Sequence, residues 1–364
     1  MALPRLQAEP QRANTRPEAP SSGSTHPSRR RVLKTSVGAG FGLGAIGLLG
    51  ACSATTTASA ASSASGGSGP WTFTDDRGTT VRLDSAPTKV VAYTGTAAAL
   101  YDFGVTDIVG VFGPTKQANG KADPMAGDLP VDRLTIIGNA YGEFDVAEYA
   151  ELDPQVLITD MWEKDSLWYV PAAGLSKIEK LAPTIGITVA SEPLTTPLAR
   201  IETLAGLLGA DLTAAAAVSA KTAFQKAVEQ LRSAAKSNST IKVMAASASA
   251  DLLYVSDPEV YPDLSYYQQL GVSFIEPTNV VGGFFESLSW ENAGKYQPDV
   301  ILLDDRTGTL QPKDLTGKPT WTKLPAMTAD QIVAWNSEPR YSYTAIGPIV
   351  QGFATALQNA KKVA

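Results

Sequence analysis

Short apolar runs alternate with longer amphipathic stretches along most of the chain. Most runs are rich in Val, Ile and Leu and are bounded by polar or turn-forming residues, as is typical of strands covered on both faces. We predict strands at Lys89–Tyr93, Ile108–Val111, Val156–Thr159, Ile185–Val189, Lys242–Ala245, Tyr254–Val255, Val300–Leu303 and Ile332–Trp335. Strands that alternate with helices predict mainly parallel sheets in an α/β fold.

Between these strands, apolar residues recur three and four positions apart, which predicts helices with one buried face. One such helix ends at Gly209, and the next begins with Asp211 as its N-cap. Helices are predicted at Thr96–Phe103, Pro197–Leu208, Ala214–Ala235 and Thr344–Lys361. Ahead of them, Asp76-Arg77-Gly78 between two short strands predicts a hairpin near the start of the folded body, at Trp71.

An internal repeat divides this body into two similar halves. Residues Ala147–Ile158 parallel residues Glu291–Leu302, and both segments end in a proline followed by an apolar strand. Phe103-Gly104-Val105 in the first half is echoed by Leu270-Gly271-Val272 in the second. The order of these matches predicts two lobes, each built from the same strand–helix succession.

Composition and charge narrow the function. The chain has 364 residues, of which 44% are hydrophobic and 18% charged, as expected of a globular protein. Residues 1–51 carry seven Lys and Arg against two acids, so the rest is more acidic than the overall net charge of −6 suggests. A nucleic-acid-binding surface needs a basic footprint, and we therefore expect no nucleic-acid partner.

The rarest residues exclude several kinds of site. The chain has one cysteine, Cys52, and one histidine, His26, so no intrachain disulfide can form. Removal of a leader that ends before Cys52 would leave no histidine. Such a chain cannot hold a Ser-His-Asp or Cys-His catalytic set, nor a zinc site built on imidazole and thiolate.

The first 52 residues have the pattern of a lipoprotein leader. Ser28-Arg29-Arg30-Arg31-Val32-Leu33-Lys34 fits the twin-arginine export motif, with Arg29 and Arg30 as its arginine pair. An uncharged stretch, Thr35–Ala51, follows, and Leu49-Gly50-Ala51-Cys52 is typical of a bacterial lipobox. The alternative is a transmembrane helix, for which this stretch is short and rich in glycine.

The leader predicts where the protein works. Two acyl chains on Cys52 suffice for stable membrane anchoring, and residues 53–70 form an Ala/Ser/Thr/Gly tether. We expect residues 1–51 to be the signal peptide and residues 52–70 the lipidated cysteine with its tether. The protein is then exported by the twin-arginine pathway and anchored on the outer face of the cytoplasmic membrane of a bacterium, of the high-GC Gram-positive group.

With the lipobox and the repeat, several segments make the chain resemble the iron-siderophore substrate-binding lipoproteins of ABC importers. The resemblance covers residues 71–364. The segments on which the resemblance is based are Phe73–Gly78, Pro87–Ala92, Leu152–Ile158, Leu288–Glu291, Leu324–Met327 and Gln331–Val333.

The resemblance implies two three-layer α/β lobes joined by a single long helix, with the ligand cleft between them. We place the N-terminal lobe at residues 71–194, the interlobe helix at 195–210 and the C-terminal lobe at 211–364. The implied function is capture of a ferric siderophore and its delivery to an ABC permease, without enzymatic activity. The protein itself needs no cofactor or metal ligands, because the siderophore already surrounds the iron. We expect a monomer.

In open α/β sheets the ligand contacts loops beyond the carboxyl ends of strands. Aromatic faces and an arginine fork suit a rounded, partly apolar complex with oxygen acceptors. The ligand-binding candidates are Tyr93, Tyr141, Trp162, Tyr254, Arg306, Trp335, Arg340 and Tyr341. Each aromatic could instead pack in the core, and Arg306 could instead pair with Asp304 or Asp305.

The family docks on its permease through one exposed glutamate in each lobe. The resemblance assigns this role to Glu291 in the second lobe. In the first lobe the matching position is Ala147, so Glu148, one residue later, is the candidate, with Glu143 as a further possibility.

Several ligands and one other class of protein remain open. Few cationic residues lie in the candidate loops, which favours a hydroxamate complex over strongly anionic ones such as ferric citrate. Cobalamin would suit the same fold. The alternative from another class is a surface-anchored hydrolase that uses paired carboxylates. However, Asp304-Asp305 and Asp75-Asp76 are adjacent in sequence, and neighbours in a strand point to opposite faces.

Overall fold

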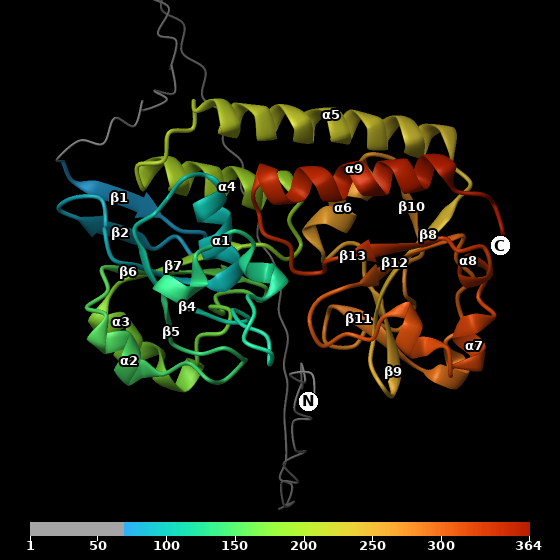
Figure 1. The fold of residues 1–364 in the computed structure, drawn as a ribbon, viewed down its shortest axis with the longest axis horizontal. Coiled ribbons are helices and arrows are strands. Elements are labelled where there is room, and N and C mark those ends of the chain that lie inside the picture. Colours follow the sequence, from blue (N-terminus) through green and yellow to red (C-terminus); the bar gives the residue numbers. More distant parts are fainter. Residues whose placement is uncertain (1–68) are drawn as a thin grey trace, which may run out of the picture. The chain divides into compact units, whose positions relative to one another are not determined.

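The computed structural model describes residues 69–364, which Figure 1 shows in colour. The predicted export residues Arg29 and Arg30, the predicted lipidation site Cys52 and nearly all of the predicted tether lie outside the described residues. Within residues 69–364, no helix is both long and apolar enough to span a bilayer.

The first lobe is built on a five-stranded sheet in the order β5-β4-β3-β6-β7, with all strands parallel. The strands are β3 (Val90–Tyr93), β4 (Ile108–Phe112), β5 (Thr135–Ile136), β6 (Val156–Met161) and β7 (Thr184–Thr188). Every residue of β3 and β6 is buried, because helices and loops cover both faces of the sheet. The predicted parallel sheet is confirmed here.

Short helices and a hairpin complete the first lobe. They are β1 (Trp71–Thr74), β2 (Thr80–Leu83), α1 (Thr94–Asp102), η1 (Pro124–Ala126), η2 (Val131–Arg133), α2 (Val146–Glu151), η3 (Ala172–Gly174) and α3 (Leu175–Leu181). The predicted hairpin is confirmed, since β1 and β2 pair in antiparallel fashion. The buried carboxylate of Asp75 accepts hydrogen bonds from the backbone N–H groups of Arg77, Thr79 and Gly186, which fastens the hairpin to β7.

The second lobe carries a six-stranded mixed sheet in the order β11-β9-β8-β12-β13, with β10 also paired to β8. The strands are β8 (Lys242–Ala248), β9 (Leu252–Ser256), β10 (Ser273–Phe274), β11 (Phe285–Ser289), β12 (Val300–Asp304) and β13 (Ile332–Trp335). Strands β8, β10, β12 and β13 run parallel, whereas β9 pairs in antiparallel fashion with both of its neighbours, β8 and β11. Only three residues join β8 to β9, and so short a connection can join only antiparallel strands.

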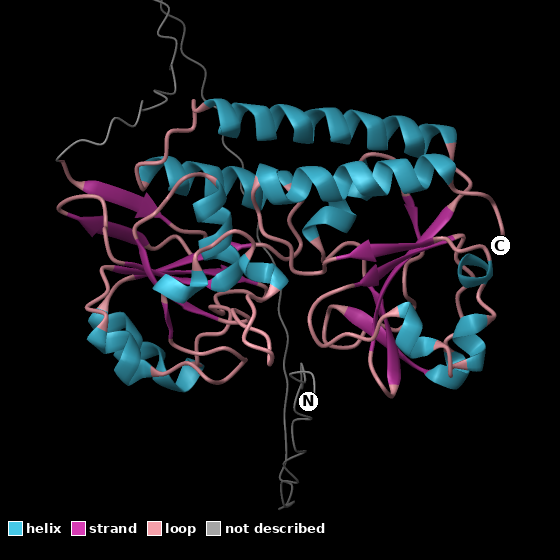
Figure 2. Ribbon diagram, in the orientation of Figure 1, coloured by secondary structure: helices cyan, strands magenta, loops and turns pink. Residues whose placement is uncertain are grey.

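Short helical elements flank the second sheet, so that each sheet has helices on both sides, as Figure 2 shows. They are α6 (Pro262–Gln269), η4 (Trp290–Asn292), η5 (Pro312–Leu315), α7 (Pro319–Thr322) and α8 (Pro325–Thr328). Alternate residues of β12 face different layers. Val300 and Leu302 join a core shared by both lobes, while Ile301 and Leu303 pack with Trp290 and Trp321 on the other face.

The structure differs from the prediction in the helix that connects the lobes. The predicted connector, residues 195–210, corresponds to α4 (Thr195–Leu207), which packs against α1 and β7 of the first lobe. The connector is the next helix, α5 (Ala215–Ser237), which leads into β8. Its 23 residues span about 34 Å. The prediction named the first of two consecutive helices, whereas the second is the one long enough to reach the other lobe.

The last helix, α9 (Tyr343–Asn359), runs alongside α5, and Figure 1 shows the two as adjacent long helices. At its start, the Ser342 hydroxyl donates a hydrogen bond to Asp102 at the end of α1. At its end, the Asn238 amide donates to the carbonyl oxygen of Leu357 at 3.0 Å. The two lobes are therefore bridged by a pair of packed helices, only one of which is the covalent connection from β7 to β8.

Candidate ligand-binding site

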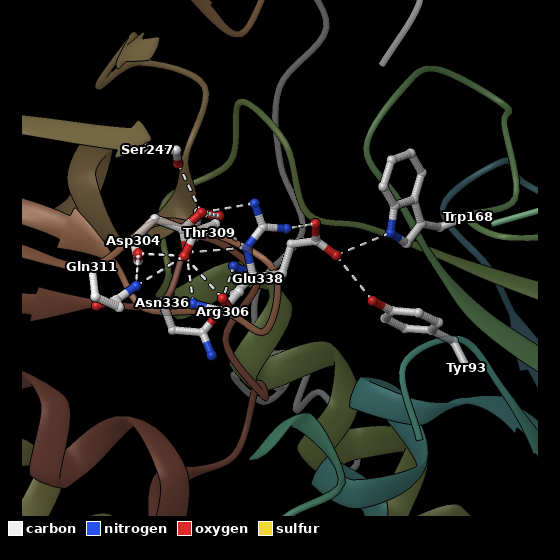
Figure 3. A network of polar contacts seen from close by, with 10 residues as sticks. Tyr93, Trp168, Ser247, Asp304, Arg306, Thr309, Gln311, Asn336 and Glu338 are labelled. Atoms are coloured by element: carbon white, nitrogen blue, oxygen red, sulfur yellow. Dashed lines mark hydrogen bonds and ion pairs between the residues drawn. The ribbon is translucent and has the colours of Figure 1, made fainter. Parts of the chain in front are cut away.

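Three hydrogen-bond donors from two lobes converge on one carboxylate, that of Glu338 (Figure 3). The Tyr93 hydroxyl donates to Glu338 Oε2 at 2.9 Å, and the Trp168 indole N–H donates to the same oxygen at 3.2 Å. The Arg306 guanidinium donates to Glu338 Oε1. Tyr93 ends β3 and Trp168 follows β6 in the first lobe, whereas Arg306 and Glu338 follow β12 and β13 in the second. The carboxylate therefore links the lobes.

Arg306 is held on its other side by Asp304, the last residue of β12. The guanidinium lies 2.8 Å from Asp304 Oδ2, and Asp304 is fully buried. The hydroxyls of Ser247 and Ser337 donate to the same oxygen at 2.7 and 3.1 Å. Burial alone would raise the pKa of Asp304, but the charge and hydrogen bonds of Arg306 outweigh burial, and the pKa is lowered. Arg306 therefore presents a fixed guanidinium toward the first lobe.

The first lobe contributes a group of aromatic rings that pack in tilted and edge-to-face arrangements. Tyr169 lies 5.2 Å from Tyr93 and 5.3 Å from Tyr141, measured between ring centroids, and Trp168 lies 5.9 Å from Tyr141. Tyr141 is 57% exposed, the most solvent-accessible ring of the group. Tyr169 has a backbone φ of +61°, a conformation that a bulky residue rarely adopts and that is often found at functional sites.

A second aromatic contact joins the lobes beside this group. The buried Trp162 lies 6.4 Å from Trp168 of its own lobe, and 5.9 and 6.4 Å from Tyr261 and Phe284 of the second lobe. We refer to Tyr93, Tyr141, Trp162, Trp168, Tyr169, Arg306 and Glu338 as the interlobe cluster.

The structure brings together four of the eight ligand-binding candidates, namely Tyr93, Tyr141, Trp162 and Arg306. The pairing of Arg306 with Asp304, weighed as the alternative to a ligand-binding role, occurs as well. The guanidinium nevertheless reaches a second partner, Glu338, and its side chain is 29% exposed.

The other four candidates lie outside the cluster. Trp335 and Tyr341 are buried in the core, and the Trp335 indole donates to the Asp263 carboxylate at 2.7 Å. Arg340 lies 3.9 Å from Asp102. Tyr254 packs against Phe285 across the β9–β11 pair, with 4.9 Å between ring centroids. For the two buried rings, core packing is the role that the structure supports.

Sequence reasoning missed Trp168, Tyr169 and Glu338. The two aromatic residues lie several positions beyond the end of β6, outside the short window searched after each strand. Glu338 lies between Trp335 and Arg340, both of which were selected, and could have been found there.

Two further buried carboxyls lie near the cluster. Asp160, at the end of β6, accepts a hydrogen bond from the Thr96 hydroxyl at 2.8 Å, and burial raises its pKa to about 7. Burial also raises the pKa of Asp263 to about 6. No group of three or more His, Cys, Asp or Glu residues in the described part of the chain could hold a metal ion.

Three of the four adjacent acids considered for a hydrolase have structural partners. Asp304 is paired with Arg306, as described above. Asp75 fastens the hairpin, and the Asp76 carboxylate accepts from the backbone N–H of Thr188 at 2.8 Å. Neither Asp304-Asp305 nor Asp75-Asp76 therefore forms a pair of free carboxyls that could act as acid and base on opposite sides of a substrate bond.

A separate crevice lies beneath the start of α5, between Phe103, Glu202 and Val218. Its volume is about 160 Å³, whereas pockets for drug-sized ligands have volumes of about 300–1,000 Å³. The crevice is therefore smaller than the pockets that hold such ligands.

The two predicted docking acids are exposed. Glu148 is the third residue of α2, whose N-cap, Asp145, accepts from the backbone N–H groups of Ala147 and Glu148. Glu291 lies in η4, after the strand β11. Both precede the sheet strand of the repeated segment, β6 in one lobe and β12 in the other.

Comparison with known proteins places these features in context. Residues 90–339 match the family described as periplasmic binding protein. The chain is 50% identical to DesE, a ferric-siderophore receptor protein from Streptomyces coelicolor, with a TM-score of 0.78 over 81% of this chain and 100% of that one. No curated protein matches the chain.

Two solved structures of lower identity have the same fold. They are the petrobactin-binding protein YclQ from Bacillus subtilis, at 16% identity and a TM-score of 0.63, and the catecholate-siderophore binding protein VctP from Vibrio cholerae, at 15% and 0.57. The alignments cover 80% and 79% of this chain and 99% of each of the others.

Proposed function

The chain belongs to the periplasmic binding protein family, and we propose that it captures a ferric siderophore outside the cytoplasm and delivers it to an ABC permease for iron uptake. Its family and its structural neighbours are substrate-binding proteins rather than enzymes. The observation that carries the proposal is the interlobe cluster, where packed aromatic rings of one lobe lie near an arginine of the other.

This arrangement suits a ligand whose iron is already enclosed. The outer surface of a ferric siderophore is partly apolar and displays oxygen acceptors, so the protein must supply apolar area and a few donors. The exposed ring of Tyr141 supplies area, and Trp168 and Arg306 supply N–H donors. No protein ligand to iron is needed.

The charges around Arg306 favour a hydroxamate complex. Its guanidinium lies between two carboxylates, Asp304 and Glu338, so the group as a whole carries no excess positive charge. A strongly anionic complex, such as a ferric tricatecholate or ferric citrate, would meet like charge there. A neutral or cationic ferric trihydroxamate would not. Cobalamin, which also needs an aromatic site and no protein metal ligand, is the other ligand to test.

We propose that the protein is a monomer held at the membrane by lipid on Cys52 after twin-arginine export directed by Arg29 and Arg30. The order of export motif, apolar stretch and lipobox cysteine supports this proposal.

Docking on the permease is proposed to use Glu291 of the second lobe and Glu148 of the first. Both side chains are exposed, and the segments that carry them are related by the internal repeat. Carboxylates at these two positions could pair with basic residues of a membrane partner.

The test is a tryptophan-fluorescence titration. All six tryptophans lie in residues 71–364, two of them in the interlobe cluster, and an iron chromophore bound there would quench nearby indoles. The ligands are a ferric trihydroxamate, a ferric tricatecholate, ferric citrate and cobalamin, with iron-free siderophores as controls. We expect saturable quenching by the trihydroxamate at one site per chain. If only cobalamin gives saturable quenching, the transported ligand is cobalamin rather than a ferric siderophore. If the protein is folded and no ligand gives saturable quenching, the proposal is refuted.

A further inference from the structure

The Glu338 carboxylate accepts hydrogen bonds from three donors of the interlobe cluster, two of them from the opposite lobe. Its Oε2 accepts from Tyr93 and Trp168, and its Oε1 accepts from Arg306 (Figure 3). A phenol, an indole N–H and a guanidinium are the groups expected to receive ligand oxygens. The protein's own carboxylate thus makes the bonds that a bound complex would make.

The environment of Glu338 strengthens the hydrogen bonds that its carboxylate accepts. Its side chain is only 15% exposed, and hydrogen bonds to a charged acceptor in such surroundings are stronger than those in water. Burial raises the pKa of Tyr93 well above its usual range, with the nearby Glu338 charge as the next contribution, so the phenol stays protonated and donates. Arg306 keeps its charge too, because Asp304 and Glu338 outweigh the effect of burial and raise its pKa.

The backbone allows the carboxylate to leave without unfolding a strand. Glu338 lies three residues beyond β13, in a loop, and its backbone N–H is held by the Asn336 side chain at 2.9 Å. Rotation of the side chain toward water would free the three donors. Arg306 would keep its second partner, Asp304, and its orientation.

We propose that Glu338 is an internal competitor of the ligand. In the ligand-free protein it joins the lobes by occupying the donors of Tyr93, Trp168 and Arg306, and oxygens of the bound complex replace it. This inference rests on the proposed function, since it concerns the same site. It assigns to Glu338 a role opposite to that of a ligand contact, because its removal strengthens binding.

The experiment compares ligand affinity among the full-length wild type, Glu338→Gln and Glu338→Ala by fluorescence titration with a neutral ferric trihydroxamate. Glutamine can still accept one hydrogen bond but carries no charge, whereas alanine removes the competitor. We expect affinity to rise in the order wild type, Glu338→Gln, Glu338→Ala, with a gain of about tenfold for alanine. The matched control is Glu163→Gln, which removes an exposed carboxylate of the first lobe outside the network and leaves affinity unchanged.

A ligand-free measurement tests the interlobe link by itself. Hydrogen exchange of the backbone around Trp168 is expected to be faster in Glu338→Gln than in the wild type and unchanged in Glu163→Gln. Circular dichroism and unfolding curves establish that each variant is folded. Equal exchange in the wild type and Glu338→Gln would overturn the link.

The possible results separate this inference from the proposed function. If the wild type binds the complex and the Glu338 variants bind it equally or more weakly, Glu338 is not a competitor and the receptor function stands. Weaker binding would make Glu338 a direct ligand contact. If neither the wild type nor the variants bind any ferric complex, the proposed function fails, and the competition with it.

Discussion

Asp160 and Asp304 occupy equivalent positions in the internal repeat, at the ends of β6 and β12, and both are buried. Their surroundings differ two residues later, where the first lobe has Trp162 and the second has Arg306. Asp304 pairs with that arginine, and its pKa is lowered. Asp160 has a hydroxyl partner, and burial raises its pKa to about 7. Arg306 therefore favours the charged form of Asp304, whereas burial favours the neutral form of Asp160.

The difference between Trp162 and Arg306 also gives the two lobes different chemistry at the interlobe cluster. The first lobe presents rings at the interlobe cluster, while the second presents a guanidinium and a carboxylate fixed by ion pairs. The two lobes thus differ at the carboxyl ends of two equivalent strands, β6 and β12. The predictions below test whether the two sides differ in this way.

The largest effect is expected from removal of Arg306. Arg306→Ala leaves the buried Asp304 without its cation, and breaking such a pair should lower the free energy of unfolding by about 3 kcal/mol. Urea unfolding at pH 7 measures the loss. The loss should shrink at pH 5, because the unpaired acid can then be protonated. A loss of unfolding free energy below about 1 kcal/mol at pH 7 would show that the ion pair with Arg306 does not stabilise the buried charge of Asp304.

The next effect concerns the opposite behaviour of the two aspartates with pH. The pKa of Asp160 in the folded protein lies above its unfolded value, so the contribution of Asp160 to stability falls as pH rises from about 4 to 7. Asp160→Asn should remove this dependence. At pH 8 it should be more stable than the wild type by about 1–3 kcal/mol, and near pH 4 the difference should vanish.

Asp304→Asn is the matched comparison. The pKa of Asp304 is lowered on folding, so its carboxylate stabilises the protein above the unfolded pKa, and this contribution is lost as pH falls through the folded pKa. The variant should therefore be less stable than the wild type at pH 7. Changes of the same sign in both variants at neutral pH would contradict the proposed difference between the lobes.

A smaller effect on stability, but a clear effect on binding, is expected at the exposed ring of Tyr141. Tyr141→Ala should change the free energy of unfolding by less than about 0.5 kcal/mol, since the side chain is mostly in solvent. Affinity for the ferric complex should fall about tenfold with the loss of one aromatic contact. Tyr141→Phe keeps the ring and should bind nearly as the wild type does. An unchanged affinity of the alanine variant would remove Tyr141 from the site.

The smallest effect on the isolated protein is expected at the docking acids. Glu148→Gln and Glu291→Gln should leave both stability and ligand affinity unchanged, because both side chains are exposed and lie outside the cluster. Uptake of the iron complex by cells should fall in each single variant and further in the double variant. Glu151→Gln, at the end of the same helix as Glu148, should leave uptake normal. Normal uptake in the double variant would refute the docking proposal.

Much of the fold follows from local patterns. Runs such as Val156–Thr159 and Val300–Leu303 were predicted as strands and are buried parallel strands in the structure. They could be predicted because each apolar run lies within a few consecutive residues. The connector was misplaced because the length of α5 and its packing on α9 depend on tertiary structure. The antiparallel direction of β9 follows from a short turn between β8 and β9 that the apolar pattern did not reveal.

The candidate site was predictable only in part. Tyr93 and Arg306 directly follow strand ends and were found by the loop rule. Trp168 and Tyr169 were missed because the loop after β6 folds back toward β3, which depends on the path of the chain rather than on the strand pattern. Glu338 was missed because its significance comes from three partners, the nearest of them in sequence being Arg306.

The most direct test of the account is to locate iron in crystals of the protein grown with a ferric trihydroxamate, by anomalous scattering at the iron edge. The account predicts one iron per chain between the lobes, with the complex in contact with Tyr141, Trp168 and Arg306. Iron bound elsewhere, such as at the crevice beside Val218, would contradict the claim that the two lobes hold the ligand between an aromatic and a charged side.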